Sequence, residues 1–594
     1  MRTLLAATAA IALSSAALAQ PSTEPDAVVQ RQLEAYNAHD IDAFVATYAE
    51  DVELWQLGPE SRLLARGREA LRREYAEFFA QARPHAEITQ RQSTGPYIVD
   101  RERVTTGTGE YVEASATYLV EAGLIRRVWF APAPARAGND ARPLALTGGT
   151  LIDGSARPAI ADSVVIIASG QIQCAGDRAR CPVPAGAEQV DVTGRFITPG
   201  LVDTHIHTGQ TGWVDGRPDG LVTNNVYPYA EVAAALRADP GRWHRAQLCS
   251  GVTAAFDVGG QPWTVAEAQR VRGRPTRLNL RAAGPLVTPA PQAALNLPGE
   301  PTFLPLASLE DARRSVEQAR TSGADAVKLW FIAPAPAQRE AVDSYVREIG
   351  RAARAAGLPL IVHATELREA KVAIRAGATM LVHSVTDGPV DEEFLQLLVS
   401  RQVAYAPTLV VGRNWLRALT SVVYETAPTI QDPNGCVDEA LRARIADAAR
   451  LRADLPPQLT GDALLNAVRS GGAEDAVAVE NLRRVRRAGG RIVLGTDAGN
   501  PLTLHGASVH AELEAMESAG IPAEELIGIA TRNGAAALND AARYGTIEAG
   551  KQADLIVLTE DPRRAARAFR SISHVMRGGV LYDQSELRVA AARR

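Results

Sequence analysis

The sequence ITPGLVDTHIH, residues 197–207, decides the fold class of the larger part of this chain. Its apolar residues lead into two histidines, His205 and His207, separated by one residue. Because alternate side chains of a strand share a face, the two imidazoles point together near the end of a strand. Imidazoles placed in this way are natural ligands for zinc or a similar divalent ion. An ordinary polar strand end has the same pattern, so the motif needs support from elsewhere.

Strand-like runs alternate with helical stretches on both sides of this motif. Such alternation predicts a parallel sheet covered by helices, and eight runs are the number that a closed (β/α)8 barrel needs. We therefore predict an α/β chain with a (β/α)8 TIM barrel over residues 199–544, in which Arg413–Gly472 is a mostly helical insertion. The eight runs are Gly200–His205, Ala254–Asp257, Arg277–Ala282, Ala326–Leu329, Leu360–His363, Met380–His383, Ala404–Leu409 and Arg491–Asp497.

Residues that can bind metals or move protons stand at the ends of several other runs. The fourth run ends around Lys328, the fifth at His363, the sixth at His383 and the eighth at Asp497. Barrel enzymes place their catalytic groups at the C-terminal ends of the strands. We therefore expect these four residues to form one site together with the two histidines of the motif.

Lys328 is unusual because the chain has only three lysines among 63 basic residues, the others being Lys371 and Lys551. A protonated lysine repels metal cations. Carboxylation by carbon dioxide turns lysine into an anionic carbamate that can bridge two metals, and arginine cannot react in this way. The alternative is that Lys328 forms a salt bridge with Asp325 or Asp257.

Several further segments resemble the amidohydrolase superfamily, in particular its imidazolonepropionase-related and Xaa-Pro-dipeptidase-like branch. Besides the opening motif they are GADAVKLW, LIVHA, MLVHS, IVLGTDAG and YGTIEAGKQADLIVL, and the resemblance covers about Pro143 to Tyr582. It implies two divalent ions, expected to be zinc. By this resemblance His205 and His207 bind the more buried ion, carbamylated Lys328 bridges, and His363 and His383 bind the second ion, while Asp497 contacts the first ion and handles the proton.

The resemblance also implies a small β-sandwich built from both ends of the barrel domain, residues 143–198 and 545–585. Strand-like runs occur there at Ala145–Ile152, Ser163–Ala168, Gln171–Cys174, Ala553–Leu558 and Ser573–Tyr582. One departure lies after the third barrel strand, where many peptidase-like members carry a stretch rich in glycine and histidine. Here residues 284–303 read GPLVTPAPQAALNLPGEPTF, without a histidine, which argues against dipeptidase activity but not against the metal centre.

Residues just beyond the strand ends should shape a substrate pocket. The substrate-binding candidates are His505, Tyr405, Trp330 and Glu366, and Trp213 and Thr365 are further candidates for shaping the pocket. Each has a structural alternative: Trp330 can pack under a loop, Glu366 can cap the following helix, and His505 can have a supporting role. Glu512 is expected to pack or cap.

Residues 26–130 form a separate predicted domain. The order helix, helix, strand, helix and long strands, and the segment YNAHDIDAFVATYAEDVEL, resemble the ketosteroid-isomerase-like (SnoaL-like) α+β cone fold. This resemblance implies an apolar pocket, used by some members for catalysis and by others for binding or pairing. We expect Tyr36 in the core and Asp40 as a helix cap, the alternative being that both face the pocket with His39. Residues 131–142 are a predicted linker.

The first 19 residues have the features of a secretory signal peptide. Arg2 precedes the apolar stretch Leu4–Leu13, and Ala17-Leu18-Ala19 supplies a small-residue cleavage site, so a periplasmic or secreted protein is expected. None of the four cysteines forms a CxxC pair. In an oxidising compartment Cys174 and Cys181 could bridge a short loop, or they could remain two unlinked thiols.

The composition excludes some classes of partner. The net charge is −5 and no basic run follows a phosphate backbone, so no nucleic-acid partner is expected. Beyond the N-terminus no apolar run is long enough to span a bilayer. The sequence leaves a homo-oligomer open.

The predicted activity is metal-dependent hydrolysis of an amide or peptide-like C–N bond in a small molecule, such as a dipeptide or an N-acyl amino acid. A metal-bridged hydroxide would attack the carbonyl, with Asp497 as general acid/base. Two alternatives stay open. The same centre could act as a lactonase, esterase or phosphotriesterase, or the chain could be an inactive exported ligand-binding protein.

Overall fold

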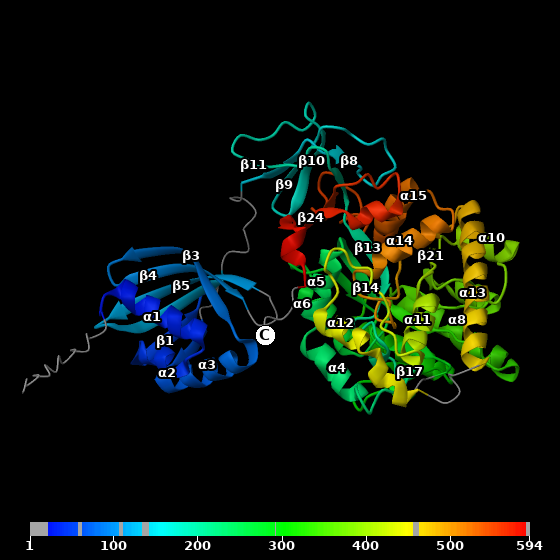
Figure 1. Cartoon of the computed structure of the whole chain (residues 1–594), viewed down its shortest axis with the longest axis horizontal. Helices are drawn as coiled ribbons and strands as arrows, with labels where there is room; N and C mark the ends of the chain where they lie inside the picture. Colours follow the sequence, from blue (N-terminus) through cyan, green and yellow to red (C-terminus); the bar gives the residue numbers. More distant parts are fainter. Residues whose placement is uncertain are drawn as a thin grey trace, which may run out of the picture. The chain divides into compact units, whose positions relative to one another are not determined.

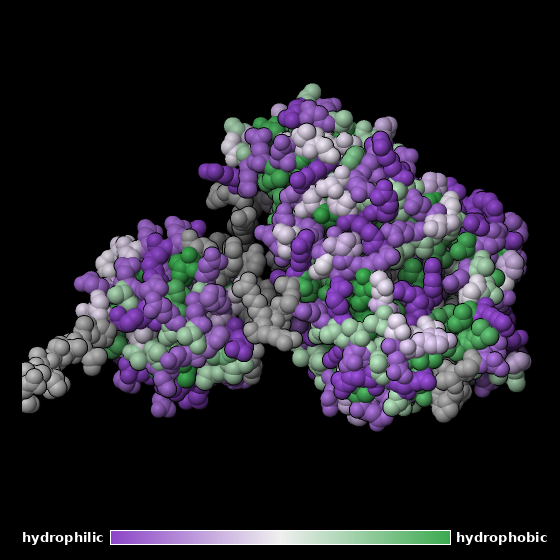
Figure 2. All heavy atoms as spheres, viewed as in Figure 1, coloured by the Kyte–Doolittle hydropathy of each residue, from purple (hydrophilic) through white to green (hydrophobic). Residues whose placement is uncertain are grey.

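The computed structural model describes residues 22–57, 62–105, 111–132, 142–290, 293–455 and 462–589. The chain divides into two compact units, Met1–Ala137 and Gly138–Arg594 (Figure 1). The predicted signal peptide and all but the ends of the predicted linker lie outside the described residues. Within the described ranges, no helix combines the length and apolar character needed to cross a membrane. Hydrophilic and hydrophobic residues are intermixed over the visible surface of each unit (Figure 2).

The first unit is a six-stranded sheet with three helices. The strand order is β2-β1-β6-β5-β4-β3, and all neighbours are antiparallel except β1 and β6. The elements are α1 (Pro25–Ala38), α2 (Ile41–Ala46), β1 (Tyr48–Gln56), β2 (Arg62–Arg66), α3 (Arg68–Ala82), β3 (His85–Thr94), β4 (Tyr97–Thr105), β5 (Tyr111–Glu121) and β6 (Leu124–Pro132).

Local interactions in this unit agree with the sequence. The Asp40 carboxylate accepts hydrogen bonds from the backbone N–H groups of Asp42 and Ala43 at 3.1 and 3.0 Å, which caps α2. Tyr36 is buried against Phe44 and Phe79 in the core. Both residues therefore have the structural roles predicted for them. A pocket in the unit is lined by Leu54, Leu63, Leu64, Ala65, Glu74, Tyr75 and Phe130.

Two small sheets of the second unit are built from both ends of its sequence. They have the orders β10-β9-β7-β11 and β25-β24-β23-β12-β8. Leu146 and Val165 of one sheet share an apolar cluster with Val557 and Met576 of the other. The strands are β7 (Leu144–Thr147), β8 (Thr150–Leu151), β9 (Ser163–Ala168), β10 (Gln171–Asp177), β11 (Glu188–Asp191), β12 (Phe196–Pro199), β23 (Leu555–Leu558), β24 (Ile572–Arg577) and β25 (Val580–Asp583).

Between these flanks lie two sheets whose strands are all parallel, in the orders β13-β14-β15 and β17-β16-β18-β19-β20-β21-β22. Backbone hydrogen bonds connect the two sheets, from Asp325 N to the Ala282 carbonyl at 2.8 Å and from Thr204 N to the Leu494 carbonyl at 2.9 Å. The strands are β13 (Leu201–Ile206), β14 (Val252–Asp257), β15 (Asn279–Ala282), β16 (Leu286–Thr288), β17 (Phe303–Pro305), β18 (Val327–Trp330), β19 (Leu360–His363), β20 (Met380–Val382), β21 (Ala404–Ala406) and β22 (Arg491–Ile492).

Every one of the eight predicted runs contains a strand, although the last ends five residues earlier than expected. The sequence did not predict β16 and β17, which form within the segment 284–303. Strand side chains alternate between two apolar layers: Val202, Phe256 and Ile361 belong to an inner cluster, whereas Leu280 and Val362 pack in an outer cluster with the helices. The result is a TIM-barrel-like α/β fold.

Helices follow most of these strands, and several of them, such as α8 and α9, cover the outer layer (Figure 1). The helices in the described part of this unit are α4 (Tyr229–Ala238), α5 (Gly241–Cys249), α6 (Trp263–Val271), α7 (Leu309–Ser322), α8 (Arg339–Ala355), α9 (Leu367–Ala376), α10 (Glu392–Ser400), α11 (Val411–Val423), α12 (Glu439–Ala446), α13 (Asp462–Arg487), α14 (Ser508–Ser518), α15 (Ala523–Gly528) and α16 (Gly534–Ala537).

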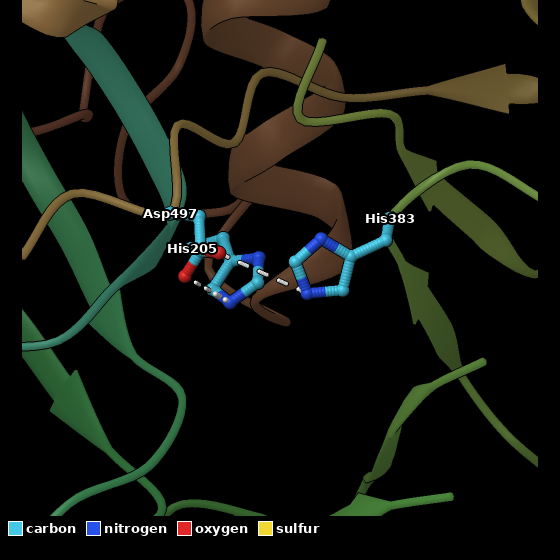
Figure 3. A group of neighbouring side chains, drawn as sticks. All are labelled: His205, His383 and Asp497. Atoms are coloured by element: carbon cyan, nitrogen blue, oxygen red, sulfur yellow. Dashed lines mark ion pairs between the residues drawn. The ribbon is translucent and has the colours of Figure 1, made fainter. Parts of the chain in front are cut away.

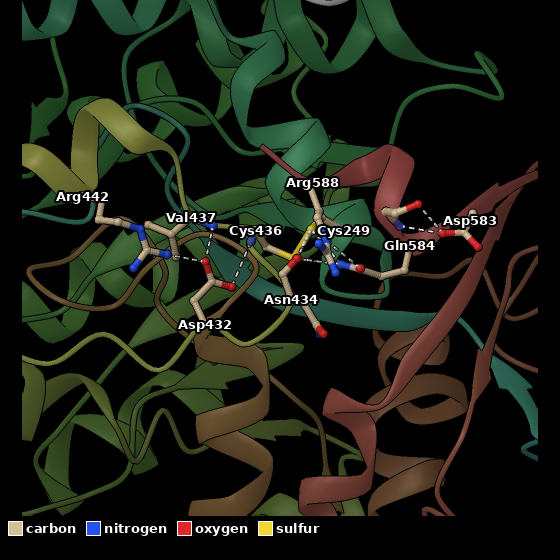
Figure 4. Close-up of a disulfide and its surroundings, with 10 residues drawn as sticks. Cys249, Asp432, Asn434, Cys436, Val437, Arg442, Asp583, Gln584 and Arg588 are labelled. Atoms are coloured by element: carbon tan, nitrogen blue, oxygen red, sulfur yellow. Dashed lines mark hydrogen bonds and ion pairs between the residues drawn. A yellow bond between two sulfur atoms is a disulfide. The ribbon is translucent and has the colours of Figure 1, made fainter. Parts of the chain in front are cut away.

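The predicted insertion contains most of α11, all of α12 and the start of α13. Leu441 of α12 packs with Trp213 and Leu504, which belong to the loops after β13 and β22. A disulfide between Cys249 and Cys436 links α5 to the insertion (Figure 4). The sequence did not predict this disulfide, because 187 positions separate the two cysteines.

All four cysteines are paired, since Cys174 and Cys181 form the second disulfide. Of the two alternatives that the sequence left open for this pair, the structure therefore contains the bridge. It closes a loop of only seven positions, so the two disulfides restrict very different lengths of the unfolded chain.

We predict that the long-range disulfide stabilises the fold more than the short-range one. In the chain-entropy account, closing the Cys249–Cys436 loop is worth about 5 kcal/mol and closing the Cys174–Cys181 loop about 2 kcal/mol. The Cys249→Ser/Cys436→Ser variant should therefore unfold at a lower temperature than the matched Cys174→Ser/Cys181→Ser variant. Thermal unfolding measured by circular dichroism tests this, and equal or reversed losses would contradict it.

Candidate metal centre

Strand ends of the TIM-barrel-like fold bring the predicted metal ligands together. The Nε2 atoms of His205 and His207 lie 3.2 Å apart. Oδ1 of Asp497 lies 3.2 Å from the first of these nitrogens and 3.0 Å from the second. His383 Nε2 lies 3.9 Å from the other Asp497 oxygen. Figure 3 shows the His205, His383 and Asp497 side chains directed toward one another from different parts of the chain.

The remaining two predicted ligands adjoin this group. The His363 and His383 rings are 4.4 Å apart between centroids. Lys328 lies on β18, next to β19, and its side chain is buried. Its two proposed salt-bridge partners are engaged elsewhere: Asp325 pairs with Arg272 and Arg281, and Asp257 accepts hydrogen bonds from Thr208 and Gly259. The structure therefore does not contain the salt bridge that was the alternative for Lys328.

Burial and nearby charges keep the imidazoles of three histidines in the cluster unprotonated. Burial, together with the positive charge of Lys328, holds the pKa values of His205, His363 and His383 well below the usual range. Burial also lowers the pKa of Lys328 to about 7. For Asp497 burial acts to raise the pKa, but His207, His383 and Arg217 outweigh it and the pKa is lowered. At neutral pH the imidazoles of His205, His363 and His383 are therefore neutral, with free lone pairs, beside a carboxylate.

Hydrogen bonds on the far side of two rings set their orientation. His207 Nδ1 lies 2.6 Å from the Gly259 carbonyl, and His383 Nδ1 lies 2.7 Å from the Thr408 hydroxyl. If Nδ1 of His207 donates to that carbonyl, its Nε2 has the lone pair that a metal needs. His383 and Asp497 both have positive φ values, 73° and 62°. Backbone conformations of this kind persist in non-glycine residues only where the surroundings enforce them, and they are common at functional sites.

Two buried carboxylates that the sequence did not single out hold the turns around the cluster. Asp257 accepts from the backbone N–H groups of Thr208 and Gly259, and it thereby fixes the carbonyl that faces His207. Asp203 accepts from the backbone N–H and hydroxyl of Thr496, the residue before Asp497. Their positions at strand ends were a usable signal, but the partners were not visible in sequence.

The arrangement fits a divalent metal ion. Ligand atoms of a tetrahedral zinc ion with bonds of about 2.0 Å lie about 3.3 Å apart, and the three atoms of His205, His207 and Asp497 are separated by 3.0–3.2 Å. Asp497 Oδ1 is also buried without a hydrogen-bond partner. Such an orphaned oxygen is costly unless a cation satisfies it. Imidazole and carboxylate donors suit zinc and related ions.

One of the predicted substrate-binding residues, Trp330, contacts the cluster, and Glu366 follows His363 by three positions in the chain. Trp330 is half-buried, packs on Phe303 at 5.1 Å between ring centroids and meets the His363 ring edge-on at 5.8 Å. Glu366 is half-buried at the start of α9, and its side chain makes no capping hydrogen bond. Their substrate contacts remain predictions.

The other two are buried. Tyr405 belongs to the outer apolar layer with Phe394, because its neighbours on β21, Ala404 and Ala406, occupy the inward positions. His505 stacks on Trp243 and has its Nε2 3.0 Å from the Gln210 carbonyl, in the loop after β13. The substrate roles of both residues stay predictions.

One cation near the cluster was missed in the sequence. Arg217 donates to both oxygens of Asp219, at 2.8 and 2.6 Å, and to the Asn500 side chain. Its guanidinium also lies over the Trp415 ring, and its charge acts on Asp497 and His363. Three of the five N–H groups are thus engaged, which leaves two for another partner.

Comparison with known proteins identifies the class. Residues 196–581, more than half of the chain, match the amidohydrolase family, and residues 29–128 match the SnoaL-like domain. The chain therefore belongs to the amidohydrolase family, which confirms the resemblance of its motifs. The match to the SnoaL-like domain agrees with the resemblance of the N-terminal segment.

Individual relatives are more distant. An imidazolonepropionase of Methylobacterium sp. is 30% identical over 249 residues, which are 38% of this chain and 60% of that protein. A 5-methylthioadenosine/S-adenosylhomocysteine deaminase of Symbiobacterium thermophilum is 30% identical over 155 residues, 24% of this chain and 35% of that protein. The chain thus covers less than two thirds of either relative.

Among solved structures, a Xaa-Pro dipeptidase with methionine bound in its active site has a TM-score of 0.56 and 20% identity, covering 74% of this chain and 100% of that chain. At this level of identity the likeness shows a common fold.

Proposed function

We propose that the protein is a metal-dependent hydrolase that cleaves an amide or peptide-like C–N bond in a small molecule carrying a carboxylate. The observation that carries the proposal is the convergence of buried imidazoles on the Asp497 carboxylate at the strand ends. Membership in the amidohydrolase family supports it. The names of the relatives, imidazolonepropionase and Xaa-Pro dipeptidase, describe those proteins and point to the same bond type.

Two divalent ions are the proposed cofactors, with zinc as the expected metal. His205, His207 and Asp497 would hold one ion, and His363 and His383 the other. Lys328 would join them as a carbamate, because a neutral amine attacks the carbon of carbon dioxide. A C–N bond forms, one C=O electron pair moves to oxygen, and the nitrogen loses a proton to water. When bound, such ions activate water and polarise a carbonyl.

Asp497 is the proposed proton carrier. One of its oxygens faces His205 and His207, and the other faces His383. Neighbouring groups keep its pKa low, so it is ionised and able to accept a proton from the attacking water. It would then give this proton to the leaving nitrogen, which cannot depart as an anion.

Two features favour an N-acyl amino acid as substrate. The two unused N–H groups of Arg217 match a carboxylate, which the planar guanidinium binds well. The wall near His363 is apolar, since Leu286 and Phe303 of the histidine-free segment 284–303 pack with Trp330. Such a wall suits an acyl group better than a charged amino terminus. A lactone, ester or phosphotriester substrate is the second candidate, because the same centre activates water for those bonds.

We further propose that the protein functions in the periplasm or is secreted. The support is the N-terminal sequence together with the two disulfides, which persist in oxidising compartments. Cell fractionation of a tagged chain tests this proposal.

A combined metal and substrate assay tests the proposed activity. Purified protein should contain about two divalent ions per chain and hydrolyse N-acyl amino acids faster than dipeptides, lactones or phosphotriesters. Turnover of esters without amides would favour the second candidate. Fewer than about one ion per chain after gentle purification would instead favour a ligand-binding protein without activity.

The Lys328→Ala variant is expected to lose bound metal and activity. A short carboxylic acid such as acetate or propionate should restore both in part, because it supplies the two oxygens that the carbamate would provide. Metal content measured by mass spectrometry is the readout, with Lys371→Ala on the surface of α9 as the control. Full metal occupancy in Lys328→Ala would contradict the bridging carbamate.

In the Asp497→Asn variant the side chain keeps nearly the same shape, but its amide cannot act as the proton acceptor. We expect kcat to fall at least a hundredfold, since positioned acid–base groups typically contribute factors of 10² to 10⁴. Steady-state kinetics on zinc-reconstituted protein is the measurement. If the variant retains metal and turns over substrate at close to the wild-type rate, the assigned role is wrong.

A further inference from the structure

Glu512 is a buried carboxyl group on α14, outside the ligand cluster. Its side chain is fully buried, and its neighbours Val509, Leu513 and Met516 belong to the apolar layer between helices and strands. Oε1 accepts a hydrogen bond from Leu409 N at 2.8 Å, and Oε2 accepts one from Val410 N at 3.0 Å. A carboxyl group in such a layer costs free energy, so its two backbone partners are the feature to explain.

These two partners belong to the turn that follows β21. The residue before them, Thr408, has a φ of 48°, which is rare for a β-branched side chain. The surroundings must therefore hold this conformation. The Thr408 hydroxyl lies 2.7 Å from His383 Nδ1. A continuous path thus runs from Glu512 through the turn to the imidazole.

We propose that Glu512 is a positioning residue for the metal centre, holding the 408–410 turn so that Thr408 orients His383. This inference rests on the proposed metal-dependent function. The path places Nε2 of His383 on the side of Asp497, 3.9 Å from its carboxylate. Outer partners of ligating histidines commonly change metal affinity by 10- to 100-fold.

The chain contains a matched control for this device. Asp432 in the insertion is equally buried and accepts the backbone N–H groups of two successive residues, Cys436 at 2.9 Å and Val437 at 2.8 Å (Figure 4). Cys436 is part of the disulfide, and Asp432 also forms an ion pair with Arg442 at 2.6 Å. Substituting Asp432 removes the same pair of backbone hydrogen bonds, together with that ion pair, and leaves the proposed path unchanged.

The experiment compares zinc affinity in metal-free full-length protein, measured by competition with a chromophoric chelator, together with the melting temperature. Glu512→Gln presents an N–H group to one backbone N–H, and Thr408→Val removes the hydroxyl. Each should weaken zinc binding 10- to 100-fold, whereas Thr408→Ser should bind zinc nearly as wild type. Asp432→Asn should lower the melting temperature without changing zinc affinity.

The double variant Glu512→Gln/Thr408→Val distinguishes a shared path from two separate effects. If Glu512 acts through Thr408, the double variant should bind zinc no more weakly than the worse single variant. Multiplied losses, or wild-type zinc affinity in folded Glu512→Gln, would overturn the inference. If Glu512→Gln does not fold, Glu512→Asp decides by the same criterion, since it withdraws the carboxylate by one methylene.

Failure of the proposed function has a different signature. If the wild-type protein binds no zinc and hydrolyses no substrate, the proposal of a metal centre itself is contradicted. If the wild-type protein binds zinc and turns over substrate, and a folded Glu512→Gln variant has unchanged zinc affinity, only the positioning role of Glu512 is contradicted.

Discussion

Mutual repulsion between lone pairs is the constraint that organises the larger unit. Three donor atoms of His205, His207 and Asp497 are held within about 3 Å of one another in a buried place, where water cannot separate them. A flexible chain would relax such an arrangement. Hydrogen bonds hold two rings of the cluster from behind: the Gly259 carbonyl holds His207, and the Thr408 hydroxyl holds the neighbouring His383. A cation between them would convert this repulsion into binding, which is why the framework is informative about function.

The supports share one feature, in which a buried carboxyl group accepts backbone N–H groups of segments that carry or contact the proposed ligands. Asp257 accepts from Thr208 and Gly259, Asp203 from His205 and Thr496, and Glu512 from the successive residues Leu409 and Val410. A carboxyl group suits this task because its two oxygens can accept two amides. The cost of their burial is offset by these bonds, and the strained backbone at Thr408, His383 and Asp497 is stabilised at the same time.

Much of this site could be predicted from the sequence, because strand periodicity is local. An apolar run that ends in a histidine or an aspartate indicates both a strand and a candidate ligand, and the structure brings the predicted residues His205, His207, His383 and Asp497 together with His363 beside them. The supporting residues could not be found in the same way: Glu512 is about a hundred positions from the amides that it holds, and Arg217 is recognisable only by its distance to the cluster. Tyr405, by contrast, could have been placed from the sequence alone, because the small residues on either side of it already indicated which face of the strand it occupies.

The contrast between strands and loops also explains why the substrate is harder to infer than the bond type. The ligands lie on or beside strands that the fold holds rigidly, and the same centre can activate water against several kinds of carbonyl or phosphoryl group. Selectivity must come from what surrounds it, and these parts are loops and insertions. In this chain they are the apolar segment 284–303, Arg217 in the loop after β13, and the helical insertion that packs on that loop and is tied to α5 by Cys249–Cys436. Under the proposed function, this cationic group and this apolar segment near the same centre would favour a molecule that has both a carboxylate and an apolar group.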